Sequence, residues 1–232
     1  MSIPFGYVSP EQVLKDKADY ARKGIACGRA LVAATYADGV VLCADNSSTT
    51  LHKVSEIYDR IAFAGVGRYN EFDSLRIAGV RAADLKGYAY SREDVDARSL
   101  ANQYASIVGN VFTHELKPME VEILVAEVGG EAGGDQLFHI TFDGTVVDDD
   151  RYSVLGGEAD AIAGRMEEHW SPGADLAGAL GGCVAALAGP DRQLLAKELE
   201  VAVLERGNGR RAFRRLEDDA VEALLGPPSG DA

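Results

Sequence analysis

The chain has 232 residues, of which 47% are hydrophobic and only 7 are prolines, so it can bury a substantial core as one large domain or two small ones. Its 37 acidic residues outnumber its 23 basic ones, and the net charge of −14 argues against nucleic acid or an anionic membrane as the main partner. No apolar run approaches the roughly 20 residues of a membrane span, and residues 1–7 lack the basic start and long apolar stretch of a signal peptide.

The cysteines and histidines do not have the spacing of a metal site. Cys27, Cys43 and Cys183 are odd in number, lie in apolar contexts and form no CxxC pair, so we expect reduced core thiols in a cytoplasmic protein. The four histidines are isolated, and the acidic run 148–150 is typical of a solvated turn. Residues 65–67 lack the third glycine of a dinucleotide fingerprint and the Lys-Ser/Thr of a P-loop. We therefore predict neither a metal nor a cofactor.

The first predicted element is a helix near the N-terminus. Ser9 can cap the free amides of its first turn, Pro10 suits that turn, and Gln12 stands at the third position of a capping box. The helix runs to about Lys23, with Gly24 as a plausible stop.

A β-hairpin is predicted next, over Leu31–Asp45. Apolar and β-branched residues flank Asp38-Gly39, a dipeptide that tolerates the positive φ of a tight primed turn. Beyond a polar turn, Ile57–Val66 indicates a short strand or a strand pair.

The rest of the chain alternates between helical and strand periods. Gly67 opens a helical pattern to about Lys86, and a second helix runs from about Ser99 to Leu116. The later strands are predicted at Val121–Val128, Gln136–Phe142, Tyr152–Leu155, Glu198–Leu204 and Arg211–Leu216, and the later helices at Ala159–His169, Asp175–Ala188 and Asp218–Leu225. This order predicts an α+β fold with two antiparallel sheets packed face to face and helix pairs outside them.

Several stretches in this order resemble the α subunits of actinobacterial 20S proteasomes, which are noncatalytic members of the N-terminal-nucleophile hydrolase superfamily. These are SPEQ…YARKG, RALVAATYADGVVLCAD, KVSEIYDRIAFAGVG and ELEVAVLE. The resemblance implies a four-layer αββα sandwich with an extra N-terminal helix at about 9–24. It also implies a mobile gate segment at 1–8, a single domain at 9–225 and a disordered tail at 226–232.

The resemblance implies that this chain has no catalytic residue. Catalytic relatives begin the first strand with a threonine freed by processing, whose own amine helps to activate its hydroxyl. Here the aligned position holds Arg29, which can neither attack nor offer a free amine, and no threonine or serine lies between Gly24 and Thr35. Asp45 matches an acidic residue near the nucleophile of catalytic relatives, and we expect it to make a structural hydrogen bond. The active site of the threonine-type endopeptidase complex would then lie on the β subunit.

Two other functions remain open from the sequence. Ser2 would become N-terminal if Met1 were removed, so the chain could be an active N-terminal-nucleophile hydrolase using Ser2 or an internally processed nucleophile. It could also be an acidic scaffold that neither gates nor assembles.

Three residues match an activator-docking pocket of the family. Lys53 precedes an I-Y-D run and would line a pocket between neighbouring α subunits, where the C-terminal carboxylate of an activator docks. Gly67 matches a glycine whose backbone meets the same ligand, and Asp19 matches an acidic residue of the first helix. The implied partners are a homo-heptameric α ring, β subunits, a hexameric AAA ATPase and unfolded protein substrates carrying a prokaryotic ubiquitin-like tag.

The gate is expected at the N-terminus. Pro10 and Tyr20 match positions that set the gate geometry in archaeal and eukaryotic relatives. Those relatives carry a Tyr-Asp-Arg run upstream, whereas this chain has Phe5, Gly6, Tyr7 and Val8. We therefore expect residues 1–8 to form the gate in a different conformation.

Overall fold

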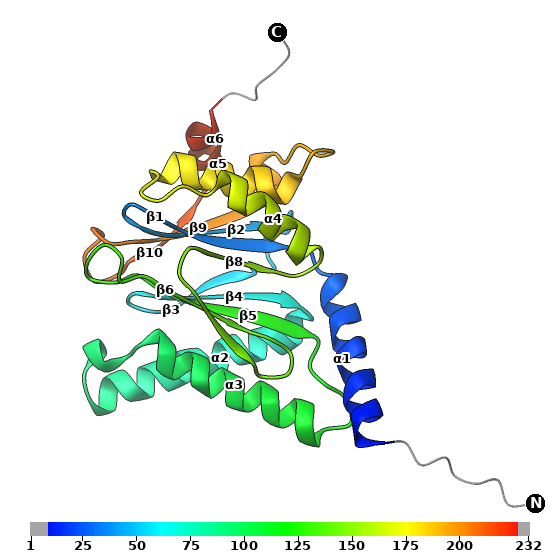
Figure 1. The fold of residues 1–232 in the computed structure, drawn as a ribbon. Coiled ribbons are helices and arrows are strands. Elements are labelled where there is room, and N and C mark those ends of the chain that lie inside the picture. The colour runs from blue at the N-terminus through cyan, green and yellow to red at the C-terminus, as the bar shows by residue number, and fades with distance from the viewer. Residues whose placement is uncertain (1–8, 227–232) are drawn as a thin grey trace, which may run out of the picture.

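The computed structural model describes residues 9–226. Figure 1 shows four stacked layers, with α4 and α5 covering the outer face of one sheet and α2 and α3 covering the outer face of the other. Helix α1 runs along one side of the stack, across the level of the second sheet. The predicted α+β architecture, including the extra N-terminal helix, is confirmed. The proposed gate segment 1–8 and residues 227–232 of the predicted tail lie outside the described residues.

Each sheet has five antiparallel strands, in the orders β10-β9-β2-β1-β8 and β3-β4-β5-β6-β7. The strands of the first sheet are β1 (Leu31–Tyr36), β2 (Gly39–Asp45), β8 (Tyr152–Leu155), β9 (Leu199–Glu205) and β10 (Phe213–Leu216). Those of the second are β3 (Val54–Tyr58), β4 (Ile61–Gly67), β5 (Val121–Glu127), β6 (Gln136–Ile140) and β7 (Val146–Asp149). The helices are α1 (Pro10–Ala26), α2 (Tyr69–Ala89), η1 (Arg92–Asp94), α3 (Ala97–His114), α4 (Ala159–His169), α5 (Leu176–Ala188), η2 (Ala196–Glu198) and α6 (Asp218–Leu225).

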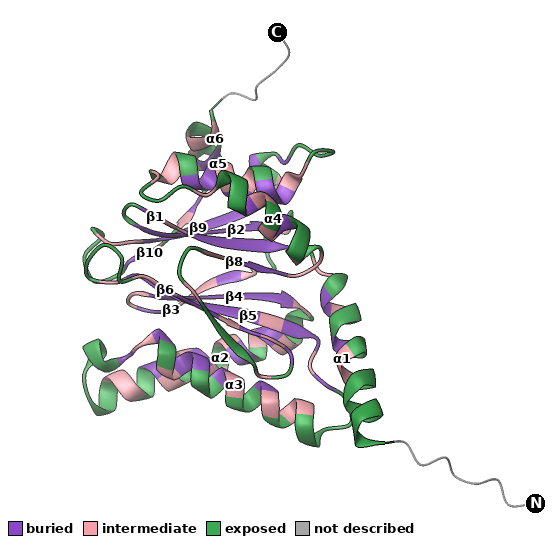
Figure 2. Ribbon diagram, viewed as in Figure 1, coloured by how far each residue is buried: buried purple, intermediate pink, exposed green. Residues whose placement is uncertain are grey.

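The central strands are apolar on both faces because both faces are covered. All seven residues of β2 are buried, and alternate side chains of β2 enter different cores. Val41 and Cys43 pack beneath α4 and α5, whereas Val40 and Leu42 pack in the layer between the sheets. Figure 2 shows the buried residues concentrated in the sheets and on the inner sides of the helices.

The turn of the β1–β2 hairpin has the glycine that its geometry needs. Tyr36 pairs with Gly39, and Gly39 has φ +149°. A Cβ at Gly39 would collide with the carbonyl oxygen of Leu204 in the neighbouring strand β9. The predicted hairpin is therefore confirmed, with close packing against β9 as a second reason for the glycine.

Three local expectations were wrong. Cys27 is exposed at the C-terminal cap of α1, whereas Cys43 and Cys183 are buried as expected. Gly67 is the last residue of β4 rather than the start of a helix, because the helix follows at α2. The acidic run 148–150 is not simply a turn, since its first two residues belong to the edge strand β7.

Helix α1 is held by a small apolar contact and keeps an apolar face in solvent. Ala21 and Ile25 pack on Phe142, and the Lys17 ammonium donates a hydrogen bond to the Phe112 carbonyl at 3.0 Å. Three large residues of the same helix, at positions 13, 14 and 20, remain exposed. Over residues 9–226 no helix combines the length and hydropathy that crossing a membrane requires. The same residues contain no cluster of three or more Asp, Glu, His or Cys side chains that could hold a metal ion.

Truncating a side chain in the layer between the sheets should destabilise the fold. We expect Leu42→Ala to lower the free energy of unfolding by about 2–5 kcal/mol, because Leu42 is fully buried between the sheets and truncation leaves a cavity. Leu116→Ala is the matched control, since Leu116 is 97% exposed, and it should change the value by less than about 0.5 kcal/mol. Urea denaturation of the purified chain measures both. Equal effects would contradict the assignment of the inter-sheet core.

Candidate functional site

The strands β1, β2, β3 and β9 bring the candidate site together at one end of the inter-sheet layer. Leu31 begins β1 and pairs with Ala44, one residue before the end of β2 at Asp45. Asp45 pairs in turn with Leu199, the first residue of β9. Val54, the first residue of β3, packs in the same inter-sheet core. Arg29, Asp45 and Lys53 therefore meet at one place although they come from separate segments.

Lys53 provides an ammonium group that is not neutralised. Its Nζ donates hydrogen bonds to the carbonyl oxygens of Arg29 at 2.6 Å and Asp45 at 3.1 Å. An ammonium has three protons, so one remains for another acceptor. Burial, with a smaller contribution from the positive charge of Arg29, lowers the pKa of Lys53 to about 8. The Asp45 and Glu200 carboxylates oppose this shift.

Asp45 is held by two arginines and is not available to Lys53 as a side-chain partner. Arg29 Nη1 lies 2.8 Å from Asp45 Oδ1, and Arg192 Nη2 lies 2.7 Å from Asp45 Oδ2. Asp45 is buried, whereas both guanidinium groups are more than half exposed. With Lys53, Glu200 and the Glu200 partner Arg215, these groups sum to four positive charges and two negative charges. The site is therefore electropositive in a chain of strongly negative net charge.

Glu200, on β9, is the second buried carboxylate of the site. Its Oε2 accepts hydrogen bonds from the backbone N–H of Lys53 at 2.8 Å and from Asn46 Nδ2 at 2.7 Å. Its Oε1 accepts from the backbone N–H of Val54 at 3.1 Å and from Arg215 Nη1. Neither Glu200 nor Arg192 is predicted as a site residue from the sequence, because no local pattern distinguishes them from surface charges.

Gly67 lies beside the same site. It ends β4, which pairs with β3, and the Gly65 N–H on β4 donates to the Lys53 carbonyl at 3.0 Å. A Cβ on Gly28, the residue before Arg29, would lie 3.2 Å from the Gly67 nitrogen. Gly67 has φ +109°, and a Cβ there would overlap the Glu120 carbonyl oxygen.

The structure separates the α1 residues from Lys53 within one chain. Asp19 is exposed and lies 3.5 Å from Arg22 in an i,i+3 ion pair, whereas the charged neighbours of Lys53 are Asp45, Glu200 and Arg29. Pro10 is the first residue of α1, after Ser9, whose Oγ accepts a hydrogen bond from the Gln12 N–H at 3.2 Å. Tyr20 is exposed on the same helix. Phe5, Gly6, Tyr7 and Val8 lie outside the described residues.

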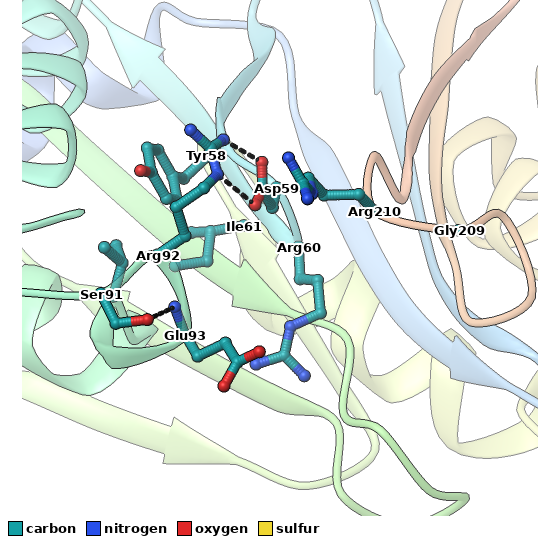
Figure 3. Close-up of a pocket in the computed structure, with 10 residues that line it drawn as sticks. Tyr58, Asp59, Arg60, Ile61, Ser91, Arg92, Glu93, Gly209 and Arg210 are labelled. Carbon is teal, nitrogen blue, oxygen red and sulfur yellow. Dashed lines mark hydrogen bonds and ion pairs between the residues drawn. The ribbon is translucent and has the colours of Figure 1, made fainter. Parts of the chain in front are cut away.

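A separate cleft of about 640 Å³ lies between the β3–β4 turn, η1 and the β9–β10 loop (Figure 3). Its charges are mostly compensated. Arg92 stacks over the Tyr58 ring with 4.5 Å to the centroid and forms a two-pronged pair with Asp59, which lowers the pKa of that carboxyl. Arg60 pairs with Glu127 at 3.2 Å. This arrangement fits a structural role for the cleft better than recognition of a charged ligand.

The electropositive site can bind a carboxylate but lacks the parts of a terminal nucleophile. The nitrogen of Arg29 is an amide nitrogen linked to Gly28, so it has no basic lone pair with which to activate a hydroxyl. The Gly28 carbonyl is itself bound by the Gly157 N–H at 3.4 Å. The two sheets between helix pairs, with an internal arginine where the nucleophile would stand, define the N-terminal-nucleophile hydrolase type of fold in a form preceded by a helix.

Known proteins agree with this assignment. A family model described as Proteasome subunit matches residues 25–204. The chain is 58% identical to the "Proteasome subunit alpha" of Acidimicrobium ferrooxidans, with all of both chains covered. It is 54% identical to that of Sanguibacter keddieii (99% of this chain, 92% of the relative) and 51% identical to that of Saccharopolyspora erythraea (100% and 95%). The chain belongs to the proteasome subunit family, as an α-type member.

The backbone at Gly67 gives a direct test of the site geometry. We expect Gly67→Ala to lower the free energy of unfolding by about 1–3 kcal/mol, because an L-residue is strained at φ +109° and its Cβ meets the Glu120 carbonyl. Gly164→Ala is the control, since Gly164 lies in α4 with open space around its Cβ, and it should stabilise the chain by about 0.5–1 kcal/mol. Urea denaturation distinguishes the two, and a neutral Gly67→Ala would contradict the described strand end.

Proposed function

We propose that this chain is a noncatalytic subunit of the α ring of a 20S proteasome, and that it docks the C-terminal carboxylate of an activator at Lys53. The observation that supports docking is the half-buried Lys53 ammonium, which contacts only neutral carbonyl oxygens among the described residues. Since no carboxylate lies within 4 Å of it there, an incoming carboxylate would gain a charge-assisted hydrogen bond from the remaining proton.

The surroundings of Lys53 favour a carboxylate over other ligands. The exposed guanidinium groups of Arg29 and Arg192 add positive charge next to the ammonium. A terminal carboxylate has oxygens for more than one donor, and the backbone of Gly67 borders the same place. The proposed activator is a hexameric AAA ATPase with a hydrophobic-tyrosine-x tail. Its substrates would be unfolded proteins bearing a prokaryotic ubiquitin-like tag, in the cytoplasm.

The exposed face of α1 supports packing against neighbouring subunits. Val13 and Tyr20 line a shallow apolar groove of about 470 Å³ together with Leu116 and Pro118. Large apolar side chains gathered on one surface typically mark a protein contact. We propose that α1 packs between subunits of a homo-heptameric ring, and that Asp19 contributes to the docking surface from this border. Peptide hydrolysis would occur in the partner β subunits.

Lys53→Ala tests the docking role. In the particle assembled with β subunits, we expect ATPase-stimulated degradation of a tagged protein to be abolished, because the activator carboxylate loses its cation. Hydrolysis of a small fluorogenic peptide should remain largely unchanged. Lys197→Ala is the control, because Lys197 is an exposed lysine of η2 without the Lys53 contacts. Unchanged stimulation in Lys53→Ala would remove Lys53 from docking.

The chain prepared without β subunits tests the hydrolase alternative. The chain expressed alone should keep residues 2–28 and should not turn over the peptide. Peptide turnover would instead identify it as an active N-terminal-nucleophile hydrolase, using Ser2 if only Met1 is lost and an internally processed nucleophile if residues 1–28 are lost.

Removal of residues 1–8 tests the gate. We propose that Phe5, Gly6, Tyr7 and Val8 restrict the axial pore, with Pro10 and Tyr20 setting the direction of the segment. Deletion should raise basal turnover of a fluorogenic peptide by the assembled particle, because substrate access no longer requires displacement of the segment. The rate measured per assembled particle, against the full-length chain, gives the comparison. No increase would place the barrier to access elsewhere.

A further inference from the structure

We propose that Glu200 is a positioning residue, whose buried carboxylate holds the backbone of Lys53 and so places the Lys53 ammonium for docking. This inference rests on the proposed docking function. Glu200 belongs to β9 in one sheet, whereas Val54, directly after Lys53, begins β3 at the edge of the other sheet. The carboxylate therefore links the two sheets at the point where the Lys53 side chain leaves the backbone.

The carboxylate satisfies backbone donors that strand pairing leaves free. Within residues 9–226, β3 is an edge strand whose single partner is β4. Glu200 accepts the N–H of Lys53 at 2.8 Å and the N–H of Val54 at 3.1 Å. Val54 is fully buried, so its N–H would carry a desolvation cost without this partner.

Glu200 also anchors the irregular segment that leads from β2 to β3. Asn46 Nδ2 donates hydrogen bonds to Glu200 at 2.7 Å and to the Leu51 carbonyl at 2.8 Å. Because the Lys53 N–H also donates to Glu200, both ends of the segment are held by the same carboxylate. On the other side, Arg215 donates to Glu200 and, through Nη2, to the Val54 carbonyl at 2.6 Å. These contacts fix residues 53–54 from three directions.

The charge of Glu200 acts on Lys53 in addition to its geometry. Lys53 is faced by Arg29 and by the Asp45 and Glu200 carboxylates, and these two acids favour the protonated ammonium. Glu200 is itself faced by Arg215 and by His52, whose Nδ1 lies 3.3 Å from Oε1. Docking requires protonated Lys53, so it should weaken as the pH rises through about 8. Without the Glu200 charge, the loss should begin at a lower pH.

Glu200→Gln and Glu200→Asp separate charge from reach. Both are studied in the particle assembled with β subunits, with a synthetic peptide that ends in hydrophobic-tyrosine-x and its C-terminally amidated form as probes. In Glu200→Gln we expect roughly tenfold weaker binding of the free-acid peptide and a midpoint of its pH dependence lowered by roughly one pH unit. In Glu200→Asp, binding of the free-acid peptide should also weaken, because the shorter side chain no longer reaches the backbone N–H groups. The midpoint of the pH dependence should change little, because the negative charge remains. Glu205→Gln, which alters a partly buried carboxylate of β9 paired with Arg214 at 3.1 Å, should change neither property.

A measurement that needs no activator keeps the two proposals separate. The reactivity of the Lys53 amine toward acetic anhydride, followed across pH by mass spectrometry, reports its protonation directly. An unchanged Lys53 profile in Glu200→Gln would overturn the positioning role, even if Lys53→Ala abolishes docking. If Lys53→Ala binds the free-acid peptide normally, the docking proposal fails whatever the labelling shows. Should Glu200→Gln fail to assemble, weakened binding in Glu200→Asp supports the positioning role and unchanged binding overturns it.

Discussion

The hydrogen bonds of the Glu200 carboxylate control the end of the sandwich where the candidate site lies. The apolar cluster between the sheets consists of leucine, valine and alanine side chains from both sheets. A buried charge there is tolerated only because Arg215, Asn46 and two backbone N–H groups satisfy it. The position of Lys53, and therefore the electropositive surface, depends on that compensation.

The site retains the strand framework of a hydrolase, while its charges fit the proposed docking of a carboxylate. Asp45 stands where catalytic relatives keep an acid near the nucleophile, yet here two arginines occupy its oxygens. The internal Arg29 replaces a reactive terminus with a cation and an amide. The same strand ends that would hold a nucleophile for attack on a peptide instead present positive charge to solvent. Such a surface suits recognition of a peptide carboxylate.

Local patterns predicted most of the fold, whereas contacts distant in sequence could not be predicted. Some features are encoded by signals that span only a few residues, namely the Asp38-Gly39 turn, the Ser9 cap and the strand periods. The hairpin, α1 and the order of the layers could therefore be predicted from the sequence. β7 was missed because its four residues are mostly exposed and half acidic, without an alternating pattern. Lys53 was found through a family motif. Arg192 lies 147 residues from its partner Asp45, and Glu200 lies 147 residues from its partner Lys53. The pairing of distant strands brings these partners together.

The exposed apolar face of α1 must be reconciled with the strong negative charge of every chain. Identical subunits of charge −14 repel one another, and at about 0.01 M salt this repulsion extends roughly 30 Å, comparable to the size of a domain. At physiological ionic strength it falls to about 8 Å, so the proposed packing of α1 between subunits would bury Val13, Leu14 and Tyr20 against a much weaker repulsion. Assembly of the proposed ring would therefore depend on salt, because dissolved ions screen the repulsion between the negatively charged subunits.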